Sequence, residues 1–280
     1  MNLEGRLRRK LAVVGHVEWM SFVAVKHLPK AGTICHATAS REEPAGGGAV
    51  AALQLARLTN EKVSFFTALG RDELGEKAAM RLKQLGLDLH VAWRDAPTRK
   101  GISFVDSAAE RTITVIGERL APLGADPLPW HLVGECDGVF VTATDAAGLR
   151  FCRRSALLTA TPRLSLEVLE KSGVCCDALI GSALDPGELV PEGFLSKPPL
   201  MRIGTEGAAG GWYEPGGRYS AIPLEADLVD SYGCGDSFAA GVTAGLAAGW
   251  SPLEAIGLGA RCGAECATTF GPFAEFNDDH

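Results

Sequence analysis

Short apolar stretches alternate with helix-like patterns along most of this chain. Stretches with the length and branching of buried strands lie at residues 11–15, 63–67, 138–142, 163–166, 178–181 and 200–204. Apolar residues at helical spacing occur between several of them, at 50–58 and at 75–85, and the second pattern ends at Gly86 as a helix C-terminus should. Continuous apolar strands separated by helices predict a mostly parallel sheet that is covered on both faces.

Two segments, residues 19–45 and 97–119, depart from this alternation and are expected to be extended. Residues 101–116 contain two alternating stretches around the polar segment 106–111, which predicts a β-hairpin. A strand pair that interrupts an α/β succession is a candidate lid over a site. Beyond it, residues 237–249 and 252–270 are rich in alanine and glycine and are predicted to form closely packed helices.

Composition limits the function classes that fit this chain. Of the 280 residues, 46% are hydrophobic and 22% are charged, which allows one large core and predicts a single domain over residues 1–280. The formal net charge is −7, and the one basic cluster is at residues 6–10, so we expect no nucleic-acid partner. We also find no apolar run long enough for a membrane span or a signal peptide, and therefore expect a cytoplasmic protein.

The eight cysteines could form disulfides, but reduced thiols fit a large, core-rich chain without an export signal better. Cys262 and Cys266 are four residues apart and would share a helical face. No histidine or second cysteine pair lies nearby at a spacing typical of a metal site.

The segment 230–238, Asp-Ser-Tyr-Gly-Cys-Gly-Asp-Ser-Phe, carries the clearest chemistry. Two glycines bracket a small residue directly before a helix, so backbone N–H groups at the helix N-terminus are left to bind an anion. An acid at Asp236 would repel a bound phosphate unless it serves as a base toward an attacking hydroxyl. The spacing alone leaves a second interpretation open, in which Asp236 only caps the helix.

This segment resembles the signature of the ribokinase-like (PfkB) carbohydrate kinases, with Cys234 where alanine is usual. The resemblance implies a three-layer αβα sandwich with a mostly parallel central sheet and a small β lid. It also implies that Asp236 is the catalytic base and that the backbone around Gly233, Cys234 and Gly235 forms the anion hole. Asp230 is then expected near the substrate, where it helps to organise magnesium and its waters.

On the acceptor side, Gly46-Gly47-Gly48 resembles the family's N-terminal glycine motif, which contacts the sugar, although the asparagine usual near Val50 is absent. Gly46, Gly48 and Ala51 also fit a dinucleotide fingerprint, but they follow a polar segment rather than a buried strand. Near the first strand, Glu18 stands in for an aspartate that is usual in the family, because a carboxylate can accept two hydroxyl hydrogens. His16 is interpreted as an ordinary hydrogen-bonded histidine.

On the nucleotide side, residues 204–210 are similar to the family's T-x-G-x-x-G turn, and this similarity implies ATP contacts at Thr205, Gly207 and Gly210, together with Gly235. A plain tight turn is the alternative for this segment. The adenine contacts are expected around 262–271, beginning at Cys262. Asp72, in a G-x-D-x-x-G-like segment, would by itself be a helix cap.

The family usually carries N-x-x-E after a central strand, and here residues 182–188 occupy that place with different side chains. Asp185 and Glu188 supply oxygen atoms for indirect support of Mg²⁺. In the hairpin region, Arg111, Glu118 and Arg119 are interpreted as surface charges. An arginine that reached into the site would favour a phosphorylated or acidic sugar.

The resemblance therefore implies ATP-dependent phosphorylation of a sugar hydroxyl, with ATP and Mg²⁺ as cofactors. The exposed edge of a lid sheet would also allow a homodimer through the lid, which leaves the oligomeric state open. One alternative is a nucleoside kinase of the same family, with Trp19, Phe22 and Phe104 in an aromatic acceptor pocket. The other is a sugar- or nucleotide-binding protein without catalysis. A P-loop enzyme is excluded, because no G-x-x-x-x-G-K-S/T motif is present.

Overall fold

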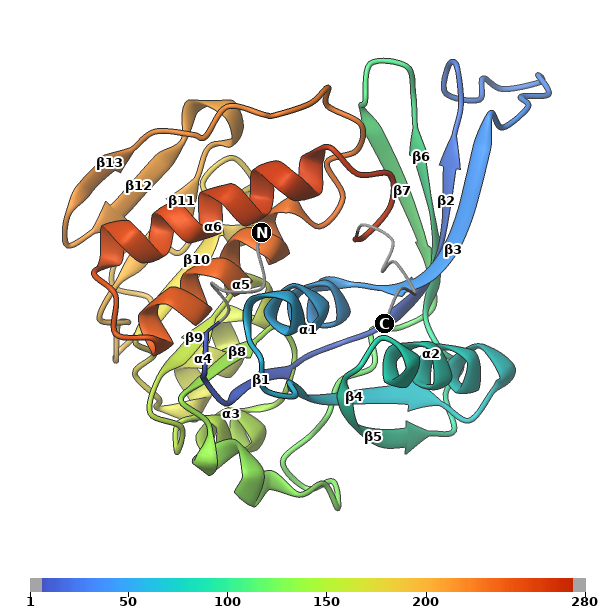
Figure 1. The fold of residues 1–280 in the computed structure, drawn as a ribbon. Helices are drawn as coiled ribbons and strands as arrows, with labels where there is room; N and C mark the ends of the chain where they lie inside the picture. The colour runs from blue at the N-terminus through green and yellow to red at the C-terminus, as the bar shows by residue number, and fades with distance from the viewer. Residues whose placement is uncertain (1–6, 274–280) are drawn as a thin grey trace.

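A nine-stranded sheet forms the centre of the computed structural model, which describes residues 7–273 (Figure 1). The strand order is β13-β12-β11-β10-β9-β8-β1-β4-β5, and the seven strands from β11 to β5 run parallel. The strands are β1 (Leu11–Val14), β4 (Ser64–Gly70), β5 (Asp88–Arg94), β8 (Gly138–Val141), β9 (Leu158–Ala160), β10 (Ala178–Ser182), β11 (Arg202–Thr205), β12 (Gly211–Glu214) and β13 (Gly217–Tyr219).

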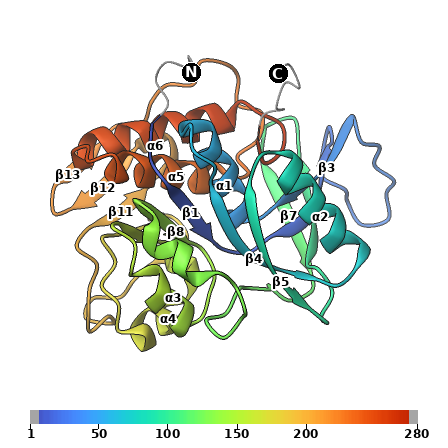
Figure 2. The same cartoon turned by 60° about the horizontal axis from the view of Figure 1, so that its bottom comes forward.

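Helices cover both faces of this sheet and complete a three-layer arrangement, as predicted (Figures 1 and 2). One face packs against α1 (Gly47–Leu58), α2 (Glu73–Gln84), α5 (Cys234–Ala247) and α6 (Pro252–Ala267). The other face packs against α3 (Ala146–Cys152), α4 (Leu166–Ser172) and the 3₁₀ helix η2 (Trp130–Glu135). Three shorter 3₁₀ turns are η3 (Pro162–Leu164), η4 (Pro186–Glu188) and η5 (Gly207–Ala209).

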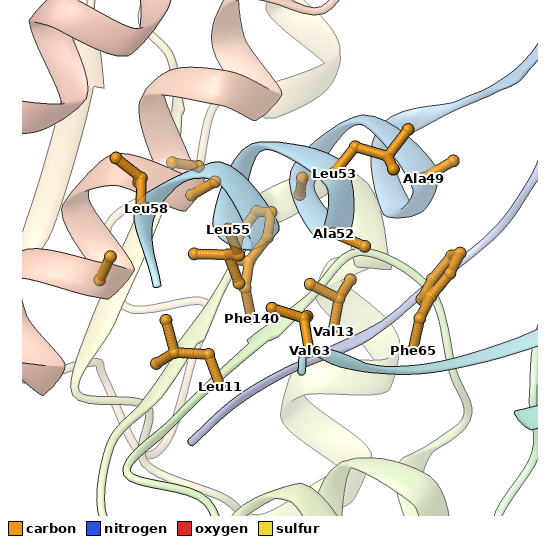
Figure 3. Close-up of a cluster of buried hydrophobic side chains, with 14 of the residues drawn as sticks. Leu11, Val13, Ala49, Ala52, Leu53, Leu55, Leu58, Val63, Phe65 and Phe140 are labelled. Atoms are coloured by element: carbon orange, nitrogen blue, oxygen red, sulfur yellow. The ribbon is translucent and has the colours of Figure 1, made fainter. Parts of the chain in front are cut away.

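The alternation of side chains along β1 shows why the sheet is buried on both faces. Leu11 and Val13 point toward α1 and meet Leu55 and Phe140 there (Figure 3). Ala12 and Val14 belong to the opposite core, under α3 and α4. Successive strand residues face opposite sides, so a strand in the middle layer must be apolar throughout.

A second, four-stranded sheet has the order β3-β2-β6-β7 and stands beside the central sheet (Figure 1). Its strands are β2 (Glu18–Ala24), β3 (Ala39–Ala45), β6 (Lys100–Val105) and β7 (Arg111–Ile116). Strands β6 and β7 pair antiparallel, with Val105 opposite Arg111, so the predicted hairpin is confirmed. We call this sheet the lid.

One predicted strand, residues 163–166, is wrong. The strand in this part of the sheet is β9, which ends at Ala160, and residues 162–164 form the turn η3 with Pro162 at its first position. Proline has no backbone N–H for a sheet ladder and favours the start of a helical turn, so the strand ends before it. Arg163 therefore lies in the turn that follows the carboxyl end of β9, and not in a strand.

Within residues 7–273, no helix combines the length and the apolar character that crossing a membrane requires. All eight cysteines are free thiols in the structure.

Candidate active site

The predicted site residues lie at the carboxyl ends of the parallel strands. Glu18 lies just after β1, Glu188 after β10, and Gly207 after β11. Strand β1 is the switch point of the sheet, because the chain continues on one side to β4 and on the other to β8. Open α/β sheets bind ligands in the crevice at such a point.

The predicted catalytic turn, a name we keep for residues 230–237, lies at the N-terminus of α5. Gly233 adopts a left-handed conformation, with φ 79°, and serves as the N-cap. The Ser237 N–H donates to the Gly233 carbonyl oxygen at 2.8 Å, and this bond closes the first turn. The N–H groups of Cys234, Gly235 and Asp236 lie before that bond, where an α-helix leaves them without intrahelical acceptors. The turn can therefore hold an anion, aided by the helix dipole.

Asp236 does not cap the helix, so the simpler of the two interpretations of this residue is wrong. The N-cap is Gly233, and no side chain caps this helix. Burial and, to a lesser extent, the nearby charge of Glu188 raise the pKa of Asp236 to about 6, against the opposing charge of Arg163. A partly buried carboxyl group with a pKa near neutrality suits a general base.

The three glycines at the start of α1 lie against this turn in different ways. A methyl group on Gly47 would come within 2.6 Å of Asp236 Oδ1, so the Gly47 backbone directly adjoins the carboxylate. Gly46 has φ 87°, and its N–H donates to Tyr232 Oη at 3.0 Å. Gly48 packs on the backbone of residues 15 and 16, where a methyl group would come 2.6 Å from the His16 carbonyl oxygen. Of the three, Gly46 and Gly47 border the space in front of Asp236.

His16 and Glu18 border the same space, next to Gly46. The Nε2 atom of His16 is 3.6 Å from Glu18 Oε1, and Arg99 Nε is 3.3 Å from the same oxygen. Burial, together with Arg119, Arg99 and Arg163, lowers the pKa of His16 to about 3. The imidazole is therefore neutral, and its buried Nδ1 has no hydrogen-bond partner within residues 7–273. The prediction of an ordinary hydrogen-bonded histidine is therefore wrong for Nδ1, and a buried unpaired nitrogen is available to a ligand.

Asp230, the first residue of the catalytic turn, is fully buried. Its Oδ1 accepts from the Tyr232 N–H at 2.9 Å, and its Oδ2 accepts from the Gly271 N–H at 3.2 Å. In the structure this carboxylate fixes the loop that leads into α5. Its expected contact with substrate or magnesium stays a prediction.

A cavity of about 530 Å³ opens beside Gly235, between α5, α6 and the turn after β11. Four predicted nucleotide residues line it, namely Thr205, Gly207, Gly210 and Gly235. Its walls are mostly apolar, and its size falls within the range of small-molecule sites. Gly263, Ala264 and Ala267, within the segment expected to contact adenine, also line it. The sequence analysis missed several further lining residues, which carry no motif: Tyr219, Ala221, Ile222, Pro223, Leu224, Leu228 and Ala260.

Cys262 does not lie in this cavity. A methyl group on Gly241 would come 3.0 Å from its sulfur, so Cys262 faces the interface between α5 and α6. The neighbouring residues Ala260, Gly263 and Ala264 occupy the face of α6 that lines the cavity. The predicted segment 262–271 therefore does reach the cavity, but the sequence did not indicate which helical face of α6 lines it.

Asp185 and Glu188 both form ion pairs with Arg163. The remaining oxygen of each accepts a backbone N–H, from Gly187 for Asp185 and from Ser182 for Glu188, at 2.8 and 2.7 Å. Oxygen atoms with these partners fit a hydrated Mg²⁺ that is held through water better than one that is bound directly. No cluster of three or more His, Cys, Asp and Glu side chains suited to a metal ion occurs within residues 7–273.

Arg111 joins the lid to the catalytic turn. Its guanidinium donates to the backbone oxygen of Ser231 and, at 3.1 Å, to the Ser231 hydroxyl. Arg111 is exposed, as expected of a surface charge, but it also bonds to the loop before α5. Asp72 caps α2 as expected, through the Gly75 N–H, and also accepts from the N–H and hydroxyl of Thr98.

Comparisons with known proteins agree with this geometry. The family model described as "pfkB family carbohydrate kinase" matches residues 8–149 and 195–277. A ribokinase of Lactococcus lactis is 26% identical over 269 residues, which cover 89% of this chain and 87% of that protein. An ATP-dependent 6-phosphofructokinase isozyme 2 of Mycobacterium tuberculosis is 28% identical over 170 residues, which cover 61% of this chain but only 44% of its own length.

Among solved structures, an Arabidopsis thaliana ribokinase complexed with ribose and ATP superposes with a TM-score of 0.72 at 20% identity, covering 95% of this chain and 94% of that one. This likeness shows that the two share a fold. The family model, in contrast, spans most of the chain and includes both the glycine turn before α1 and the catalytic turn before α5. The chain belongs to the pfkB family of carbohydrate kinases.

Proposed function

We propose that this protein transfers the γ-phosphoryl group of ATP to a hydroxyl group of a sugar or sugar-like acceptor, with Asp236 as the general base. The observation that carries the proposal is the Asp236 carboxyl group, whose pKa is raised to about 6 at the open N-terminus of α5. On one side of it lies the space bordered by Gly46, Gly47 and His16, and on the other the cavity beside Gly235.

In this mechanism the protein positions two substrates and neutralises charge, because phosphoryl transfer asks little covalent chemistry of it. Asp236 accepts the proton of the attacking hydroxyl. The N–H groups at residues 234–236 bind the transferring group, and the dipole of α5 adds positive charge there. Glu18 and the neutral His16 accept hydrogen bonds from acceptor hydroxyls.

In this proposal the adenine of ATP occupies the apolar cavity. Thr205, Gly207 and Gly210 lie at the end toward Gly235 and the transferred phosphate. Asp185 and Glu188 would hold Mg²⁺ through water. When bound, Mg²⁺ neutralises phosphate charge during the transfer. Arg163 keeps both carboxylates oriented toward this region.

The test measures ADP release with Mg²⁺-ATP across a panel of sugars, sugar derivatives and nucleosides. The Asp236→Asn variant should lose about 10²–10⁴ in turnover and keep its affinity for ATP. Asp95→Asn, the same change at a fully exposed carboxylate, is the matched control. An Asp236→Asn enzyme within a few-fold of wild type would falsify the assignment of the base.

The same panel addresses the two alternatives. A nucleoside acceptor needs aromatic side chains in the acceptor pocket, but Phe22 is fully buried against Tyr232, and Trp19 lies beside Lys77 of α2. These positions favour a sugar. A protein without catalysis would bind ligands and release no ADP with any acceptor.

The proposal includes a homodimer formed through the lid. Strand β7 is an edge strand, and Ile113, Val115 and Ile116 on it are 40–49% exposed. A second copy would cover this apolar edge. Sedimentation at several concentrations should give a dimer, and a lysine at Val115 should make it a monomer.

A further inference from the structure

On the acceptor side of the proposed site, two arginines share a single carboxylate, while a third arginine is paired separately. Arg99, Arg119 and Arg163 all lie close enough to His16 to lower its pKa electrostatically, after burial itself. These arginines come from three separate segments: the start of the lid strand β6, the loop after β7 and the turn after β9. The fold brings them together around one small space.

The positive charge of Arg163 is balanced within the protein. It forms ion pairs with both Asp185 and Glu188. It therefore neutralises those carboxylates and has little charge to offer a ligand.

The positive charge of Arg99 is balanced only in part. Its Nε is 3.3 Å from Glu18 Oε1, yet it has no hydrogen-bond partner in the part of the chain that the structure describes. The side chain is only 19% exposed. Leaving a buried polar donor unpaired is energetically unfavourable, so such a group is a candidate for a ligand contact.

Arg119 has no carboxylate partner within residues 7–273. Its one hydrogen bond goes from Nη1 to the Arg163 backbone oxygen, at 3.0 Å, and no acidic side chain lies within ion-pair distance of it. Arg119 is an exposed residue, but partial loss of water around its guanidinium and the like charges of Arg99 and Arg163 lower its pKa, whereas Glu18 opposes them. Two guanidinium groups thus share one carboxylate, Glu18.

We propose that the acceptor carries an anionic group, a phosphate or a carboxylate, which Arg99 and Arg119 bind while its reactive hydroxyl reaches Asp236. An anion there balances the extra charge and supplies acceptors for the unpaired Arg99 N–H. Guanidinium groups favour these oxyanions because their N–H groups match two oxygens at once. The inference rests on the proposed function and names the acceptor class at that same site.

The order of contacts supports an acceptor with its two functional groups at opposite ends. Asp236 adjoins Gly47, while Glu18 adjoins Gly46, one residue earlier, and Arg99 lies beyond Glu18.

The experiment compares matched acceptors: fructose and glucose as neutral sugars, fructose 6-phosphate and glucose 6-phosphate as phosphates, and gluconate as a carboxylate. We expect kcat/KM for an anionic acceptor to exceed that of its neutral counterpart by about 10²-fold or more, because two charge-assisted contacts are gained. The phosphate and carboxylate arms identify which anion is preferred.

Variants assign the effect to residues. Arg99→Gln and Arg119→Gln should each raise KM for the anionic acceptor about 10- to 100-fold and leave KM for ATP within a few-fold. Arg99→Lys and Arg119→Lys should restore part of the lost affinity for the acceptor. Arg71→Gln, at an arginine that is 65% exposed and pairs with Asp95, is the control and should change neither.

The outcomes separate the two proposals. Turnover of neutral acceptors that equals or exceeds that of anionic ones overturns this inference and leaves the kinase proposal intact, as does an acceptor KM that neither variant changes. If no compound is phosphorylated, calorimetric binding of the same compounds decides. Binding of the anionic members that depends on Arg99 and Arg119 supports the inference, and equal or absent binding of both kinds overturns it.

Discussion

At Asp236, one carboxyl group combines two environments that oppose its ionisation. The surrounding protein removes water from it, and Glu188 places a second negative charge nearby. Local sequence identifies the residue type and the turn, but the pKa depends on Glu188, which lies 48 positions earlier in the chain. The tuning of the base is therefore a property of residues that meet only in the folded state.

The raised pKa predicts a pH dependence of the reaction. Only the ionised carboxylate accepts a proton, so kcat/KM should fall about tenfold per unit of pH below an apparent pKa near 6. Glu188→Gln should lower that apparent pKa, because it removes a negative charge beside the base. This account of the base is contradicted if kcat/KM stays constant between pH 5 and 8, or if Glu188→Gln leaves the apparent pKa unchanged.

The same shift predicts a stability effect with a defined sign. The folded pKa of about 6 lies above the ordinary value of 3.8, so the protonated carboxyl group contributes stability at low pH that is lost as the pH rises through 6. Asp236→Asn removes this loss of stability with rising pH, because the amide does not ionise. At pH 8 the variant should be more stable than wild type by on the order of 1–2 kcal/mol, discounted for the solvent that still reaches the group.

Urea unfolding at pH 5 and at pH 8 checks this prediction. The advantage of the variant should be smaller at pH 5, where much of the wild-type carboxyl group is protonated. An equal or larger advantage at pH 5 would show that packing, not charge, accounts for the difference.

At the scale of elements, α5 and α6 show why small residues dominate the C-terminal third. A methyl group on Gly259 of α6 would come 2.7 Å from the Phe238 carbonyl oxygen and 2.7 Å from the Val242 side chain. The helices can approach so closely only because these positions lack side chains. This contact sets the position of α5, whose N-terminus carries the catalytic turn, and of the face of α6 that lines the cavity.

A pair of glycine substitutions in α6 separates packing from helix propensity. Gly259→Ala should cost about 1–3 kcal/mol, because the added methyl group overpacks the interface. Gly257→Ala is the matched control, since a Cβ there meets nothing within 4 Å, and it should stabilise the helix by up to about 1 kcal/mol. Thermal unfolding of both variants checks the prediction, and a loss of stability in both would indicate a backbone effect instead.

At the scale of the whole molecule, the lid and the central sheet are linked at the site itself. Strand β2 follows directly from β1, so Glu18 lies on the lid while it contributes to the acceptor space. Arg111, on the far edge strand of the lid, bonds to Ser231 in the loop before α5. Movement of the lid would therefore change the acceptor side and the nucleotide side of the proposed site together.

Arg111→Ala should weaken this link. We expect KM for ATP to rise about 3- to 30-fold, as for the loss of one charged hydrogen bond, because Ser231 also lines the cavity. Steady-state kinetics with Glu110→Ala, at an exposed residue of the same hairpin, provides the control. Equal kinetics in the two variants would place Arg111 outside the working site.

The sequence by itself determined the elements and the catalytic turn, because both depend on local patterns. Apolar runs at 11–15, 138–142 and 178–181 correspond to β1, β8 and β10, and the glycines at 233 and 235 bracket the start of α5. The strand at Leu158–Ala160 was missed, since it is three residues long and ends just before Pro162. A strand so short leaves little periodicity to detect.

Only the tertiary structure decided what surrounds the base. His16, Arg99, Arg119 and Arg163 share no motif and are spread over 148 positions, yet strand order and loop paths place them around one space. The face of α6 that lines the cavity was decided in the same way, by the packing of Gly259 and Cys262 against α5. Periodicity constrains residues a few positions apart, whereas a binding site depends on long-range packing, which no local pattern records.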